Sequence, residues 1–241
     1  MKHALAIVFV LSLVAWRAPA PVPTDQQMME QVGQGVIVPG CADLNCFRIL
    51  VPATLESLPG PSLPRWRAFA VVANTAAALA TGRLALALGV APGVVPLIVW
   101  LSAVGAGSLS TIYHPYNADP FVWLLAPVTT LLLISGRTFA AGALATVGVF
   151  AKEFAAAPLY IAAAASAALG DWSTFAKRLA LAVTVTMIWV GLQLGLMSAF
   201  GYSYNANPSS QVLSGRGVRV DGASRPVSRR YIGAHSARSA E

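Results

Sequence analysis

The chain has 241 residues, of which 56% are apolar and only 10% are charged, and its mean hydropathy is +0.66. Soluble domains carry about 25% charged residues, so this composition excludes a disordered chain and an ordinary soluble enzyme. The net charge of +7 does not indicate a nucleic-acid binder, because residues 1–214 contribute +3 (10 − 7) and the last 27 residues contribute +4 (6 − 2). The sequence therefore predicts an integral membrane protein.

The first predicted element, within residues 1–20, is an apolar run at positions 4–16 that follows a short basic start. A charged start, a short apolar run and the small residues Ala18 and Ala20 are typical of a cleavable signal peptide. Pro19 and Pro21 would crowd the peptidase site, which favours a retained signal anchor that forms the first transmembrane helix. Both alternatives export the segment that follows.

Residues 21–66 are predicted to form one external loop, rich in Pro and Gly, that contains Cys41 and Cys46. Exported cysteines usually pair, so the C-x4-C spacing predicts a disulfide that closes a small ring. Two free thiols are the alternative. A zinc site is not expected, because no His or further Cys lies nearby.

Residues 67–200 are predicted to form an all-α transmembrane helical bundle. A transmembrane helix needs about 20 predominantly apolar residues, and three runs reach that length, at 68–88, 94–112 and 179–200. Three shorter apolar runs, at 121–135, 138–151 and 154–169, would cross tilted, form a re-entrant hairpin or join into longer helices. With the first helix, the sequence predicts six or seven membrane segments.

The loop at residues 113–120 should lie on the same face as the external loop, because two spans separate them. It contains two Tyr together with His114, Asn117 and Asp119, followed by Pro120. An interfacial aromatic belt and an Asp-Pro helix cap would explain all of these residues except His114, which could ligate a metal or donate to a phosphate. Cap and site remain alternatives.

Lys152 and Glu153 stand between Ala, Val and Phe runs. Ionisable groups at membrane depth are costly and usually indicate function or pairing. If the two preceding apolar runs cross the membrane and return, both residues reach the face of His114 and Asp119. The alternative is that Lys152 and Glu153 simply neutralise each other.

These elements, taken in order, resemble the polytopic GT-C glycosyltransferases and the uncharacterised bacterial membrane proteins grouped with them. The resemblance rests on Asp25 soon after the first segment, an Arg-x-Leu-x-Pro element at residues 48–52, the Asp119-Pro120 pair and the Lys152-Glu153 pair. It covers roughly residues 5–214. It implies a multi-pass protein of the bacterial inner membrane that transfers a sugar from a polyprenyl-phosphate donor.

The resemblance also implies roles for single residues. Asp25 would be the catalytic carboxylate, Asp119 a second catalytic acidic residue, and Lys152 would face the lipid phosphate. A carboxylate can act as general base toward the acceptor hydroxyl, and cations can stabilise the departing phosphate. The substrate-binding candidates are therefore Arg48, His114, Lys152 and Glu153, with an unassigned divalent cation as the candidate cofactor.

Two departures from the pattern leave a degenerate or truncated relative open. Asp25 is followed by Gln-Gln instead of a second carboxylate, and the relatives have more segments. The alternative function is a non-enzymatic multi-pass membrane protein, such as a transporter subunit or assembly factor.

Residues 201–241 are predicted to be a loop followed by a disordered basic tail. From residue 215 onward the chain has six Arg and no Leu, Phe, Trp or Met, so it cannot bury enough apolar surface to fold. A tail that binds anionic headgroups is the functional alternative.

Overall fold

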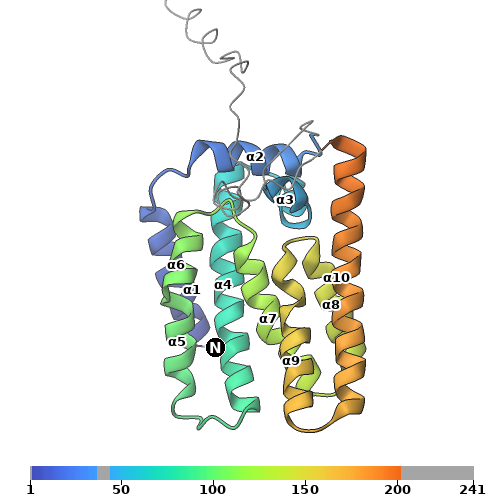
Figure 1. Cartoon of the computed structure of the whole chain (residues 1–241). Coiled ribbons are helices and arrows are strands. Elements are labelled where there is room, and N and C mark those ends of the chain that lie inside the picture. Colours follow the sequence, from blue (N-terminus) through green and yellow to red (C-terminus); the bar gives the residue numbers. More distant parts are fainter. Residues whose placement is uncertain (1, 37–43, 202–241) are drawn as a thin grey trace, which may run out of the picture. The chain divides into compact units, whose positions relative to one another are not determined.

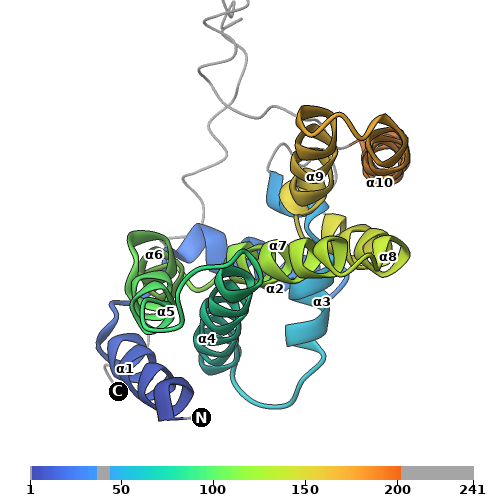
Figure 2. The same ribbon diagram turned by 90° about the horizontal axis from the view of Figure 1, so that it is seen from below.

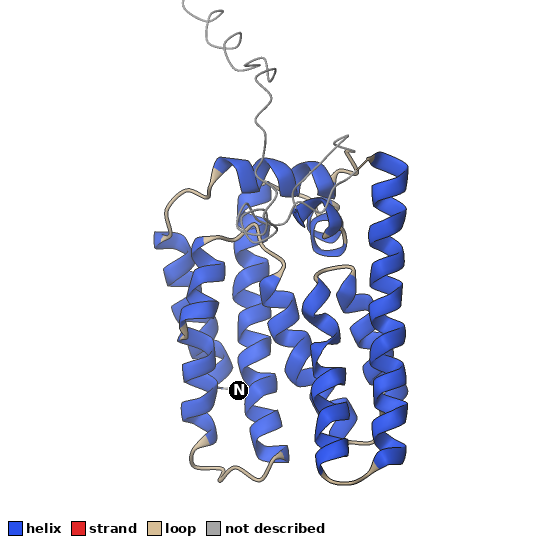
Figure 3. Ribbon diagram, in the orientation of Figure 1, coloured by secondary structure: helices blue, strands red, loops and turns tan. Residues whose placement is uncertain are grey.

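The computed structural model describes residues 2–36 and 44–201, and this part of the chain is helical with no strand (Figures 1 and 3). Two components of the sequence predictions, Cys41 and the tail after residue 201, lie outside the described residues. The helices of the first half are α1 (Lys2–Arg17), α2 (Pro23–Gly33), η1 (Leu44–Phe47), α3 (Leu50–Glu56), α4 (Ser62–Ala87), α5 (Val95–Val104) and α6 (Ala106–Tyr113). Those of the second half are α7 (Asp119–Ile134), α8 (Thr138–Val149), η2 (Glu153–Ala156), α9 (Ala157–Ala168) and α10 (Trp172–Phe200).

The helices pack around two main apolar cores. One core joins α1, α4, α5 and α6 through side chains such as Ile7, Leu11 and Ile112, which are fully buried. The other joins α7, α8, α9 and α10 around Leu159 and Val185. Seen along the bundle, α1 and α4–α6 lie on one side, α8–α10 on the other, and α7 between them (Figure 2). Helices α4 and α7 therefore connect the two cores.

Within the described residues, three helices are long and apolar enough to cross a membrane: Ser62–Ala87, Val95–Tyr113 and Trp172–Phe200. They coincide with the three full-length runs of the sequence. The predicted total of six or seven segments is not confirmed, because α7, α8 and the η2–α9 helix are shorter apolar helices. Large apolar side chains on the outside of the long helices are exposed, for example Val72 (64%) and Leu194 (59%). Such outward-facing apolar surface is suited to contact with lipid.

The second long helix is interrupted at Gly105, which separates α5 from α6. Gly105 has an extended backbone conformation (φ −64°, ψ 159°), so the helical hydrogen bonding restarts after it. Two residues later, a Cβ on Gly107 would overlap the indole ring of Trp123 on α7. The two glycines therefore allow a break in the helix and close packing of α6 against α7.

The described part of residues 21–66 is mostly helical, whereas the sequence predicted one external loop there. Its described residues form α2, η1, α3 and the first turn of α4. Pro23 stands at the start of α2, where its missing N–H costs nothing. Met29, Val51 and Leu55 bury their side chains together with Trp66. These described residues therefore form a helical layer over one end of the bundle (Figure 1), and its small apolar core also includes Tyr116, Ala118 and Ala151.

Candidate functional site

Most of the candidate residues lie at the end of the bundle that α2 and α3 cover, which we call the α2/α3 end (Figure 1). The α6–α7 loop and the turn between α8 and η2 reach the same end. These two turns and the α2–α3 layer are far apart in the sequence, and side-chain pairs join them.

Asp119 and Lys152 form an ion pair between the first residue of α7 and the turn after α8. Their side chains are 25% and 13% exposed, so both are largely withdrawn from solvent. Asn117 supports the carboxylate, because its Nδ2 donates to Asp119 Oδ2 over 3.0 Å and its Oδ1 accepts from the Asp119 N–H over 3.0 Å. The N-cap position of α7 is Ala118 and not Asp119, which the sequence suggested as the cap, and the Asp119 carboxylate pairs with the lysine instead.

Glu153 pairs with Arg48, whose Nη2 lies 3.5 Å from Glu153 Oε1. The backbone N–H of Leu50 donates to the carbonyl of Phe150 over 3.1 Å, which fastens the start of α3 to the same turn. Lys152 and Glu153 therefore do not simply neutralise each other. Each one binds a partner from a distant part of the chain, and together they place two cations and two carboxylates around the turn between α8 and η2.

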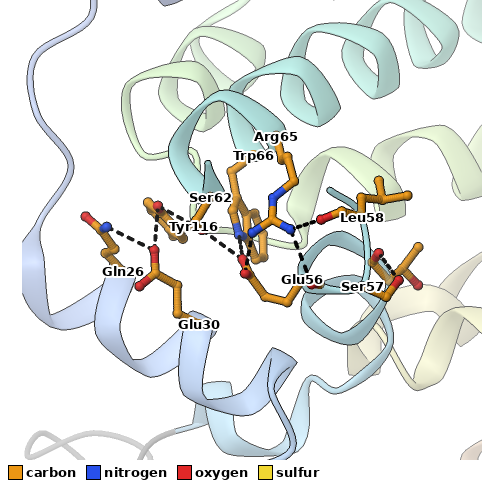
Figure 4. A network of polar contacts seen from close by, with 10 residues as sticks. Gln26, Glu30, Glu56, Ser57, Leu58, Ser62, Arg65, Trp66 and Tyr116 are labelled. Carbon is orange, nitrogen blue, oxygen red and sulfur yellow. Dashed lines mark hydrogen bonds and ion pairs between the residues drawn. The ribbon is translucent and has the colours of Figure 1, made fainter. Parts of the chain in front are cut away.

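A second polar network joins α2, the end of α3, the beginning of α4 and the α6–α7 loop (Figure 4). The Glu56 carboxylate accepts hydrogen bonds from Ser62 Oγ (2.8 Å), Arg65 Nη2 (2.5 Å) and Trp66 Nε1 (3.0 Å). Arg65 also donates to the carbonyl oxygens of Glu56 and Leu58. These bonds join the end of α3 to the beginning of α4, so they restrain the short connection between the two helices.

Tyr116 links this network to α2. Its hydroxyl lies 3.0 Å from Glu30 Oε1 and 3.2 Å from Ser62 Oγ, and Gln26 Nε2 also donates to Glu30 over 2.9 Å. The Tyr116 ring packs against Trp66 with the ring centroids 5.1 Å apart. The α6–α7 loop is thereby attached to both α2 and α4.

The environment changes the proton affinity of two of these groups. Burial raises the pKa of Tyr116 to about 12, and the Glu30 and Glu56 carboxylates add to that shift. Burial also tends to raise the pKa of Glu30, but hydrogen bonds with Gln26, Ser62 and Tyr116 outweigh it and hold the pKa below its ordinary value. Near neutral pH this part of the network therefore consists of a neutral phenol and an ionised carboxylate.

Asp25 and His114 also lie at the α2/α3 end, but among the described residues no hydrogen bond or ion pair joins either of them to the Asp119–Lys152 pair. Asp25 stands in the first turn of α2 and is half-buried. His114 follows the last residue of α6 and its side chain is exposed. Of the candidates, the structure thus joins Asp119 to Lys152 and Arg48 to Glu153, and leaves Asp25 and His114 outside both pairs.

A groove of about 580 Å³ opens at the α2/α3 end, between α3, α4 and α7, and none of the four residues of the Asp119–Lys152 and Arg48–Glu153 pairs lines it. Its walls are almost entirely apolar, and Arg65 is its one charged residue. Phe121, two residues after Asp119, forms part of the wall. Volumes of 300–1,000 Å³ are typical of ligand sites, and this one would accept a hydrocarbon chain.

The donor set does not fit a divalent cation. Among the described residues no group of three or more His, Cys, Asp or Glu side chains comes together, and Asp119 is occupied by a lysine. Cys46 is buried in η1, whereas its expected partner Cys41 lies outside the described residues, so the disulfide stays a prediction.

Arg65, Trp66 and Ser62 were not among the sequence candidates. The number of spans between loops is the signal that could have found them. Because two spans separate residues 21–66 from residues 113–120, the start of α4 and Glu56 were expected at the same end as residues 113–120. The spacing of these residues in the sequence does not show that they pair.

No protein-family model, no curated protein and no solved structure matches this chain.

Proposed function

We propose that this protein is a multi-pass protein of the bacterial inner membrane that transfers a sugar from a polyprenyl-phosphate donor at the external membrane face. The observation that supports this proposal best is that the Asp119–Lys152 and Arg48–Glu153 pairs lie at the same end of the bundle as the apolar groove between α3, α4 and α7. In this proposal α1, α7, α8 and the η2–α9 helix complete the six or seven membrane segments, and the α2/α3 end faces outward.

The reaction needs a base and a stabilised leaving group. An acceptor hydroxyl attacks the anomeric carbon, the base takes the hydroxyl proton, and the bond from that carbon to the phosphate oxygen breaks with its electron pair on the phosphate. Asp25 is the proposed base, because its carboxylate has no ion-pair partner among the described residues. Asp119 is assigned to holding Lys152, which makes it a positioning residue in this scheme.

Cations at the α2/α3 end stabilise the departing polyprenyl phosphate. Lys152 and Arg48 are the proposed phosphate-binding residues, with Glu153 orienting Arg48 and His114 available at the same end of the bundle. The chain of the donor would lie in the groove against Phe121 and Phe69.

The test is a transfer assay with membranes that contain the full chain and a labelled polyprenyl-phosphate sugar. Asp25→Asn should abolish transfer, because an amide cannot accept the proton. Asp171→Asn is the matched control, since Asp171 is fully exposed in front of α10 at the opposite end. Transfer by the wild type that is insensitive to Asp25→Asn would show that Asp25 is not the base.

A non-enzymatic multi-pass protein is the second candidate function. The two ion pairs favour this candidate. Asp119, Lys152, Arg48 and Glu153 each already have an oppositely charged partner from a distant part of the chain, so their charges have a structural role without a substrate. No transfer from any labelled donor, together with unchanged assembly of the Asp25→Asn variant, would favour this candidate.

A further inference from the structure

A second groove lies on the other flank of α4, between α4 and α1. Its volume is about 410 Å³, and it opens along the outside of the two helices near the α2/α3 end. The lining is nearly all apolar and includes Val8, Ala15, Trp16, Ala68 and Val72. Trp16 and Val72 are 76% and 64% exposed, so the groove faces outward, where the lipid of a membrane would be. This groove takes no part in the function proposed above.

Arg67 is the only charged residue that lines this groove. Its Nη2 donates to the carbonyl oxygens of Ala18 (3.0 Å) and Pro19 (2.9 Å), which hold the guanidinium at the end of α1. None of the three ion pairs in the described part of the chain includes Arg67. Carbonyl oxygens carry no net charge, so the positive charge of Arg67 is not neutralised by a carboxylate.

Arg17 adds a second cation at the same place. Its guanidinium carbon lies 5.8 Å from the centroid of the Trp16 ring, and Trp16 lines the groove. Arg17 also has no carboxylate partner in the described residues. Tryptophan is enriched at the level of lipid headgroups, and arginines near the surface attract anionic headgroups. The groove thus has apolar walls and one cation, Arg67, in its lining, and a second cation, Arg17, lies over the ring of its lining residue Trp16.

We propose that this groove is a binding site for one anionic phospholipid. One acyl chain lies against Val8, Ala15 and Val72, and the phosphate lies between Arg67 and Arg17. Charge complementarity selects this occupant over a neutral lipid, because two arginines without carboxylate partners gain an opposite charge only from an anionic headgroup. Arginine also fits a phosphate through two parallel hydrogen bonds, which favours a phosphate in this position.

The experiment measures quenching of Trp16 fluorescence by brominated lipids in the purified full chain. The protein is placed in phosphatidylcholine nanodiscs that contain equal mole fractions of brominated phosphatidylglycerol or brominated phosphatidylcholine. Because the chain has six Trp, the signal of a Trp16→Phe variant is subtracted. We expect stronger quenching by the anionic lipid, and Arg67→Gln should reduce this preference about fivefold, since one arginine near a membrane surface contributes about 1 kcal/mol.

Arg83→Gln is the matched control, because Arg83 is an exposed residue of the same helix sixteen positions further on. It should keep the wild-type preference. Since Arg67 also holds the end of α1, Arg17→Gln is the second variant, and it should weaken the preference without removing a hydrogen bond to the backbone. A third variant, Ala68→Leu, fills the groove and should reduce quenching by both lipids.

Several results would overturn the proposal. Equal quenching by both lipids would show ordinary bilayer contact, and an unchanged preference in both Arg67→Gln and Arg17→Gln would exclude the arginines. Competition by inorganic phosphate alone would indicate an anion site without a lipid chain. A Trp16 that neither lipid quenches would indicate coverage by a second copy of the chain. Mass spectrometry showing that residues 1–20 are absent from the purified protein would remove one wall of the groove.

Discussion

The Asp119–Lys152 pair offers the most direct test of how the two turns at the α2/α3 end are held together. Replacing Lys152 by Met leaves the Asp119 carboxylate, which is only 25% exposed, without its cation. Breaking a buried ion pair by removing one partner costs about 3–5 kcal/mol. Because both side chains keep some exposure, we expect a value at the lower limit, about 3 kcal/mol.

For a chain of this size, 1 kcal/mol corresponds to about 2–4 °C in the unfolding midpoint, so Lys152→Met should lower Tm by about 6–12 °C. Asp119→Asn should be similarly destabilising, because it leaves the lysine unpaired. The double variant Asp119→Asn/Lys152→Met has neither charge and should lose clearly less than the sum of the two single variants. Thermal unfolding of the purified protein in a neutral detergent measures all three.

Lys177→Met is the control, because Lys177 is an exposed residue of α10. Its Tm should change by less than about 2 °C, as expected for a surface substitution. Equal changes in Tm for Lys152→Met and Lys177→Met would show that the ion pair does not stabilise the fold. A loss of Tm in the double variant equal to the sum of the two single losses would show the same.

Two further predictions concern packing and pH. Gly107→Ala should destabilise the protein by about 1–3 kcal/mol in the same thermal assay, because its Cβ would overlap the Trp123 ring, whereas Gly191→Ala, with nothing near its Cβ, should not. The pKa of Glu30 is lower in the folded protein than its ordinary value, so the unfolded chain binds more protons and stability should fall as the pH drops below about 4.5. Glu30→Gln should flatten the dependence of Tm on pH between pH 3 and 6, and an identical slope in both proteins would contradict the role of Glu30.

The sequence by itself determined the helices and their apolar character. A long apolar run has few alternatives to a helix, since every backbone polar group must be satisfied within the segment when no water is available. For this reason α4, the α5–α6 pair and α10 coincide with the three full-length runs. Counting the spans between two loops also requires no knowledge of packing. Two spans separate residues 113–120 from the segment after the first helix, so the sequence predicted that both lie at the same end of the bundle.

Only the tertiary structure decided which charges meet. Lys152 pairs with a residue 33 positions earlier and Glu153 with one 105 positions earlier, although each has an opposite charge as its immediate neighbour. The fold of residues 21–66 was also decided in this way, because α2 and α3 are stabilised by burying Met29 and Val51 against Trp66. Local periodicity reports only the composition of one segment, whereas these contacts depend on how the turns at the α2/α3 end approach one another in space.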